Sequence, residues 1–77
     1  MKIRVVLHSV LRERLPPETN GKADLELPEG CTVQEVIHRL GLPQHVSCAI
    51  NGQIERSLHK ILQDGDEVRF FRPGAGG

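Results

Sequence analysis

The sequence is poor in aromatic residues and in cysteine. It contains no Trp or Tyr and only two Phe residues, so aromatic side chains make up 3% of its 77 residues. Any hydrophobic core must therefore be aliphatic, built from Val, Ile and Leu. Two cysteines, Cys31 and Cys48, are too few and too irregularly spaced for a disulfide scaffold or a zinc site. We therefore expect a reducing, cytoplasmic environment.

The chain also lacks an excess of charge of either sign and any long apolar run. Lys plus Arg number 10 and Asp plus Glu number 10, which argues against a nucleic-acid-binding protein because such proteins normally carry a basic excess. No apolar run approaches the ~20 residues of a membrane span, and Arg4 and Arg12 interrupt any signal-peptide pattern. The histidines show no metal-ligand spacing. We expect no nucleic-acid partner, no membrane and no metal site.

The two cysteines have different predicted environments. Cys48 lies between Val46 and Ile50 in an apolar segment, which predicts a small buried side chain. Cys31 lies just before a predicted helix, where the helix dipole can lower the pKa of a thiol. Cys31 is therefore a candidate redox residue.

Two segments near the N-terminus alternate between apolar and polar residues, as half-buried strands do. In residues 2–8 the inward face carries Ile3, Val5 and Leu7, although Val6 breaks the polar side. Residues 23–27 alternate again, with Leu25 and Leu27 inward. Between them, residues 9–15 predict a short helical turn that ends at two prolines. Its expected inward residues are Val10, Leu11 and Leu15.

One helix is predicted after the second strand. Thr32 and Glu35 fit a capping box at its start. Apolar residues then recur at the helical spacing and form one stripe: Val33, Val36, Ile37 and Leu40. Gly41 closes the helix and Pro43 prevents its continuation.

The remaining residues predict three more strand segments. Residues 46–50 and 53–54 are joined at Asn51-Gly52, the strongest two-residue hairpin signal. Three apolar residues follow as expected anchors: Leu58, Ile61 and Leu62. An acidic turn at residues 64–66, read as only a turn, leads into a last strand at residues 67–72. A lone helix on one face of a four- to five-stranded sheet suits this order. We predict an α+β fold, a β-grasp domain over residues 1–72.

The segment after the last strand, residues 73–77, is predicted to be a flexible tail. It consists of Pro73, Gly74, Ala75, Gly76 and Gly77. Glycine has no Cβ, so a Gly-Gly terminus can thread a narrow channel and leaves its carboxyl carbon open to attack. We therefore expect the carboxylate of Gly77 to be the reactive group.

Phe71 is predicted to lie on the open face of the sheet. If Val68 and Phe70 face the helix, alternation places Phe71 on the opposite side, beside the tail. An exposed aromatic side chain there is suited to anchor a partner protein. Alternatively, a side chain such as Leu15 or Val6 covers it.

These features resemble a known family. The run 62–71 followed by Gly76-Gly77 resembles the C-terminal signature of the MoaD/ThiS sulfur carriers, which are ubiquitin-like proteins. The opening strand, the Pro-Glu-Gly-Cys-Thr approach to the helix at residues 28–32 and the Asn-Gly hairpin are similar to that family too. The resemblance implies that residues 3–7 and 68–70 pair in parallel in the middle of a mixed sheet.

The resemblance also implies a function and its partners. In that family an adenylating, ubiquitin-activating-like enzyme couples the terminal glycine carboxylate to AMP. A sulfur donor such as a cysteine desulfurase or rhodanese then supplies the sulfur of a thiocarboxylate. The chain has no G-x-x-x-x-G-K-[ST] loop, so ATP is expected on the partner and no cofactor on this chain. The chain is then a protein co-substrate, or the small subunit of a molybdopterin synthase.

The expected partner-binding residues precede the terminal glycines. In molybdopterin synthases this segment enters the larger subunit, which assigns partner contacts to Phe71, Arg72, Pro73, Gly74 and Ala75. Arg69 and Arg72 either pair with an acidic rim on the partner or remain solvated edge charges.

The recipient of the sulfur stays open at this point. Residues 9–13 and 64–71 resemble the molybdopterin branch, whereas residues 51–54 resemble the thiamine branch. Residues 72–75 depart from the molybdopterin branch, which has two prolines, a Val and a small residue there. Two further classes are a ubiquitin-like modifier conjugated through Gly77 and a β-grasp interaction module with an inert tail.

Overall fold

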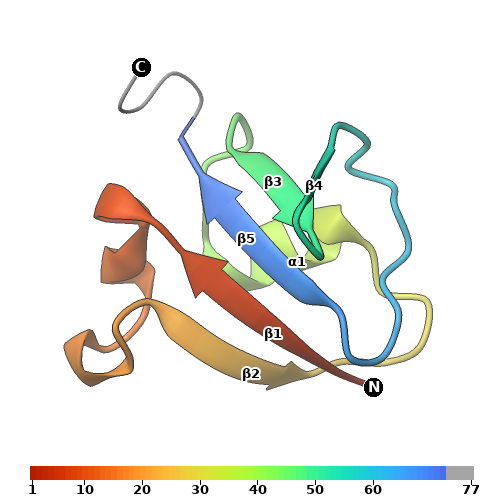
Figure 1. Cartoon of the computed structure of the whole chain (residues 1–77), viewed down its shortest axis with the longest axis horizontal. Coiled ribbons are helices and arrows are strands. Elements are labelled where there is room, and N and C mark those ends of the chain that lie inside the picture. Colours follow the sequence, from red (N-terminus) through yellow and green to blue (C-terminus); the bar gives the residue numbers. More distant parts are fainter. Residues whose placement is uncertain (73–77) are drawn as a thin grey trace.

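The computed structural model describes residues 1–72 as a sheet crossed on one face by a helix (Figure 1). The strands are β1 (Lys2–Leu7), β2 (Lys22–Glu26), β3 (Ser47–Ile50), β4 (Gln53–Glu55) and β5 (Glu67–Phe71). The helix is α1 (Val33–Leu40), and two short 3₁₀ helices, η1 (Ser9–Arg14) and η2 (Pro17–Thr19), join β1 to β2. The predicted β-grasp architecture is confirmed.

The five-stranded sheet has the order β2-β1-β5-β3-β4. The central strands β1 and β5 are parallel, with Val5 opposite Val68 and Leu7 opposite Phe70, whereas the other neighbouring strands are antiparallel. A parallel pair needs a long crossover connection, and α1 lies within it. The predicted pairing of the first and last strands is therefore confirmed.

The core lies between α1 and the sheet. The fully enclosed side chains are largely aliphatic, as the composition predicts, and include Ile3, Val5, Leu7, Val33, Val36, Ile37, Val68 and Phe70. Phe70 is the one aromatic residue in this cluster. Leu40 is only half-buried at its edge. Since full burial of an aliphatic side chain contributes about 1.5–3 kcal/mol, this layer supplies most of the driving force for folding.

The N–H groups in the first turn of α1 are capped both by a side chain and by backbone carbonyls from a distant segment. The Thr32 hydroxyl oxygen accepts from the Glu35 N–H at 3.3 Å, and the Glu35 carboxylate accepts from that hydroxyl at 3.4 Å. Two further N–H groups, of Val33 and Gln34, donate to the carbonyls of Lys60 and Leu58. The helix N-terminus is therefore occupied by the segment that leads to Leu62.

Two turns set the register of the sheet. Asn51 and Gly52 both have positive φ, 51° and 86°, as the predicted two-residue hairpin requires. The Asn51 side chain accepts from the Glu67 N–H and donates to Asp66, both at 2.9 Å. Asp64 accepts from the Lys2 N–H at 2.7 Å. The acidic turn thus fastens the start of β5 to its neighbours, as a structural turn does.

Two apolar residues expected to be inward face solvent instead. Val10 and Ile61 are each 52% exposed. Residues 9–14 form a 3₁₀ helix, whose three residues per turn separate Val10 from Leu11 by a third of a turn. Only Leu11 is buried there, with Leu15 half-buried. Ile61 makes a single bridge to Thr32, and alternation then turns its neighbour Leu62 inward.

Candidate functional site

The candidate site is the end of the sheet at which β5 finishes. Phe71 is the last residue of β5, and Arg72 follows it with an exposed side chain. The other predicted site residues lie outside the described residues: Pro73, Gly74, Ala75, Gly76 and Gly77. In Figure 1 this end of β5 lies beside η1 and the start of β3. Those segments therefore form the surroundings of any partner that receives the C-terminus.

Phe71 lies on the open face, as alternation predicts. It pairs with Ser47 of β3, whereas Phe70 pairs with Cys48 and is completely buried. Phe71 is half-buried and lies outside the core cluster, although Leu15, offered above as a possible cover, packs against that cluster. The open-face position is thus found, with a ring that is partly rather than fully accessible.

Further apolar side chains lie on the open face near Phe71. Ile54 pairs with Ala49, Ala49 with Arg69, and Arg69 with Val6, so these residues form one row across four strands. Val6 and Ala49 are buried without belonging to the core under α1, whereas Ile54 is 60% exposed. We call Val6, Ala49, Ile54 and Phe71 the open-face patch.

The open-face patch was only partly visible in the sequence. Val6 interrupts the polar side of its strand, which is the one local signal for it. Ala49 and Ile54 carry no such signal, because their neighbours become known only once the strand order places β3 between β5 and β4.

Arg69 is held within the sheet. Its Nε donates to Glu67 Oε1 at 3.0 Å, and its Nη1 lies 3.4 Å from His8 Nε2. Its position between Val6 and Ala49 in the row places its stem in the open-face patch. Of the two arginines expected to meet an acidic rim, Arg69 is therefore already paired, whereas Arg72 extends into the exit region.

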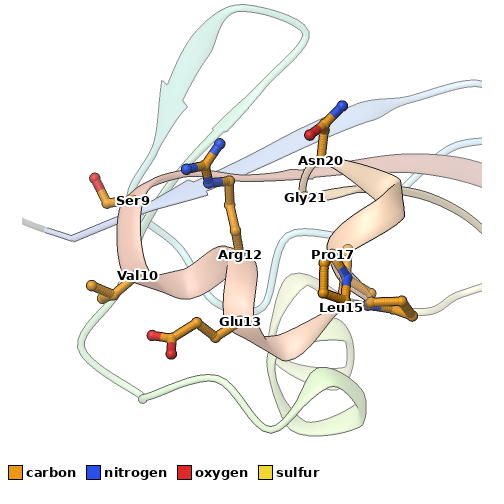
Figure 2. A pocket seen from close by; sticks show the side chains of 9 residues that line it. Ser9, Val10, Arg12, Glu13, Leu15, Pro17, Asn20 and Gly21 are labelled. Atoms are coloured by element: carbon orange, nitrogen blue, oxygen red, sulfur yellow. The ribbon is translucent and has the colours of Figure 1, made fainter.

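An open groove of about 470 Å³ lies at the C-terminal end of β5, which we call the exit of β5. Its lining comes from three segments that are distant in sequence: Val10, Leu11, Glu13, Arg14, Pro43, His45 and Arg72. A second hollow lies on the other side of η1, lined by residues that include Ser9, Arg12, Leu15 and Gly21 (Figure 2). Val10 and Glu13 line both, so η1 stands as a ridge between them.

The cysteines are not reactive groups in this structure. Both are free and 3% exposed. Burial raises the pKa of the Cys31 thiol, and the Glu35 carboxylate raises it further. The expectation of a lowered pKa at this helix start is therefore wrong, because burial and the neighbouring carboxylate outweigh any effect of the helix dipole. Burial likewise raises the pKa of Cys48, whose predicted burial is confirmed.

Residues 1–72 offer neither a metal cluster nor a membrane span. No three His, Cys, Asp or Glu side chains in that part of the chain are grouped to hold a metal ion. No helix among the same residues has the length and apolarity to cross a bilayer.

Comparison with known proteins decides the family. The sequence model of the ThiS family matches residues 10–77. The chain belongs to the ThiS family. The match includes most of η1, together with β5 and the C-terminal glycines. The opening strand, which also carried the resemblance to sulfur carriers, lies outside the matched residues. No curated protein sequence matches this ThiS-family chain.

Solved structures show the same fold. SAMP1 from Haloferax volcanii superposes with a TM-score of 0.74 at 19% identity, covering 100% of both chains. A putative molybdopterin converting factor subunit 1 from Pyrococcus furiosus gives 0.73 at 23% identity, over 94% of this chain and 97% of that one. A chain from the protein–protein complex of subunits 1 and 2 of the Helicobacter pylori molybdopterin-converting factor gives a TM-score of 0.67. The identity is 18%, and the comparison covers 100% of each chain. The ThiS-family chain therefore has the ubiquitin-like fold of these proteins.

Proposed function

We propose that this ThiS-family chain is a sulfur carrier that delivers sulfur from a thiocarboxylate formed at Gly77. The observation that carries the proposal is the family match, which extends through residue 77 and so includes both terminal glycines. The structure supports it by ending the central strand β5 at Phe71, from which the exposed Arg72 leads to residues 73–77.

The chemistry requires activation by a partner. A carboxylate resists nucleophiles because it is negatively charged and resonance-stabilised. Attack of the Gly77 carboxylate on the α-phosphorus of ATP releases pyrophosphate and forms an acyl adenylate. Sulfide then attacks the acyl carbon and AMP leaves; a persulfide gives an acyl disulfide instead, which a second thiol cleaves. The ATP site, the sulfur donor and the sulfur source all belong to other proteins in this proposal.

In this proposal the chain itself supplies the surface that the partner recognises and the tail that enters the partner's active site. The domain presents the open-face patch and Arg72 beside the exit of β5, so a partner that holds this end of the sheet receives residues 73–77 as well. Glycines at positions 76 and 77 suit a narrow channel because they have no Cβ. We place the protein in the cytoplasm, where its free cysteines stay reduced.

Molybdopterin synthesis is the proposed destination of the sulfur. Two neighbours are molybdopterin converting factor proteins, and the one from Helicobacter pylori was solved with its partner subunit. By analogy, a larger synthase subunit is the proposed second partner of this chain. Thiamine thiazole synthesis is the alternative, favoured by residues 51–54.

A protein-modifier function is the second candidate. Two neighbours from Haloferax volcanii and Methanosarcina acetivorans are small archaeal modifier proteins. In such a function the activated Gly77 carboxyl carbon joins a lysine amine through an isopeptide bond. The products differ: a carrier gains one sulfur in place of one oxygen, whereas a modifier appears in heavier adducts.

The test uses the tail and measures activation and product together. Deleting Gly77 should abolish ATP–pyrophosphate exchange with the adenylating enzyme, and Gly76→Val should be nearly as damaging, since a β-branched side chain widens the tail and restricts its backbone. Gly76→Ala is the milder matched variant. The melting temperature should stay unchanged, because the core lies within residues 1–72. Exchange and thiocarboxylate formation by the Gly77-deleted chain would contradict the proposal.

A further inference from the structure

The helix η1 has an unusual start and an exposed apolar side chain. Ser9, its first residue, has φ of 53°, a left-handed conformation that non-glycine residues rarely adopt and that the surrounding structure must hold in place. The turn at Ser9 brings η1 against the end of β5. Val10 then projects outward and is 52% exposed (Figure 2). One exposed valine is ordinary on a protein surface, so the residues around Val10 must show whether it contacts a partner.

The setting is a groove with a cationic lining at the exit of β5. Its cations are Arg14 and Arg72, and the one carboxylate among the lining residues is that of Glu13. Within residues 1–72, neither Arg14 nor Arg72 forms an ion pair with a carboxylate. Their guanidinium groups are therefore available to carboxylates from outside the domain.

The cations at the two ends of β5 differ in whether they are paired. At the start of β5, Arg4 forms an ion pair with Asp24 and lies opposite Glu67, whereas at its far end no carboxylate within residues 1–72 pairs with Arg14 or Arg72. Unpaired guanidinium groups attract an acidic partner surface. Zero net charge and the apolar Val10 and Pro43 in the groove favour a protein over a nucleic acid.

We propose that η1 and the adjoining groove dock the adenylating enzyme, separately from the open-face patch. Val10 enters an apolar pocket of that enzyme, and enzyme carboxylates pair with Arg14 and Arg72. The inference rests on the proposed carrier function and adds to it the chemistry of the recognised surface. Contacts made before chemistry lower the KM of the carrier and leave kcat unchanged.

The experiment measures ATP–pyrophosphate exchange by the adenylating enzyme at varied carrier concentration. Val10→Ser and Arg14→Glu are each expected to raise the KM about tenfold, which corresponds to about 1.4 kcal/mol, with kcat unchanged. The matched controls are Ile61→Ser, which removes a side chain of equal exposure, 52%, and Lys60→Glu, which makes the same change of charge far from the exit. Both should keep the wild-type KM. Raising the salt concentration should raise the wild-type KM more than that of Arg14→Glu.

The possible failures are distinguishable. Wild-type exchange with equal KM values for Val10→Ser, Arg14→Glu and the controls would overturn the docking site and leave the carrier function standing. Equal losses in Ile61→Ser and Val10→Ser would also overturn it, because the effect would not be local. No exchange by the wild type would overturn the carrier function and this inference with it. Melting temperatures of all variants establish that each one is folded.

Discussion

Gly21 lies where a side chain has no room. Its φ is 78°, and a Cβ there would lie 2.6 Å from the Leu7 carbonyl oxygen and 2.6 Å from Arg12 Cγ. Its own carbonyl accepts from the Leu7 N–H at 2.7 Å. The residue therefore ties the end of β1 to the start of β2 directly beneath η1.

Replacing Gly21 with Ala should destabilise the domain more than the same change at Gly30. Gly30 has a similar φ of 85° with open space around it, so Gly30→Ala should cost roughly 1–2 kcal/mol from backbone strain alone. Gly21→Ala should add about 1–3 kcal/mol, since backbone and Arg12 must move. Urea unfolding of both variants gives the comparison. Equal losses would mean that the contact at Gly21 relaxes without cost.

The buried thiols predict how stability depends on pH. Burial, and then the Glu55 carboxylate, raise the pKa of Cys48 above its ordinary value of 9.0. Above that pH the unfolded chain loses the thiol proton while the folded chain keeps it, so the free energy of unfolding decreases. The stability contribution is complete below about pH 9 and falls as the pH rises toward the folded-state pKa.

Cys48→Ala should therefore reduce the loss of stability at alkaline pH. The measurement is the melting temperature between about pH 8 and about pH 10. The wild type should show the steeper decline, and the lysines that titrate in the same range are common to both proteins. Parallel curves for the two proteins would show that the thiol ionises as easily in the folded chain as in the unfolded one.

At the scale of elements, alternation along β5 places its two phenylalanines on opposite faces of the sheet. Phe70 faces α1 and is fully buried, whereas Phe71 faces the open side and is half-buried. Adjacent phenylalanines thus belong to different surfaces because successive side chains of a strand point to opposite faces.

Alanine substitution should therefore reduce stability at Phe70 and partner binding at Phe71. Phe70→Ala should cost about 3–5 kcal/mol of folding free energy. Phe71→Ala should leave the melting temperature nearly unchanged and weaken binding to the activating enzyme or synthase about tenfold or more. Thermal unfolding and calorimetric titration measure the two effects. A large stability loss with normal affinity in Phe71→Ala would place Phe71 in the core.

Elements with one clear period were predictable from sequence, and those without one were not. The helix α1 and strands β1 and β5 combine a buried face with clear end signals, so their inward faces followed from the pattern. The parallel pairing of β1 with β5 followed from the family resemblance instead. The 3₁₀ helix η1 was expected to bury Val10 because the helical repeat of 3.6 residues was applied to it, whereas its actual period is three. Leu62 is buried in the core and Leu58 packs against it, as predicted for anchors. The carbonyls of Leu58 and Lys60 also cap α1, a long-range role that no local pattern encodes.

At the scale of the whole molecule, β5 is the central strand of the sheet. β5 is hydrogen-bonded on both sides, to β1 and to β3, and Asp66 and Asn51 fix its start. A strand held in the centre of a sheet opens only with global unfolding. The proposed function requires the domain to keep its structure when a partner binds, and a central strand suits that requirement.

The domain without the tail should compete with the complete protein. The core cluster that the structure describes is built from residues 3–70, so this fragment should fold with an unchanged melting temperature. It retains Phe71, Arg72 and η1 but lacks the reactive carboxylate of Gly77, so it should inhibit ATP–pyrophosphate exchange competitively. Its inhibition constant should lie within about tenfold of the KM of the complete chain. The fragment carrying Phe71→Ala is the matched control and should inhibit more weakly. A folded fragment that does not inhibit would show that the tail, rather than the domain, supplies the affinity.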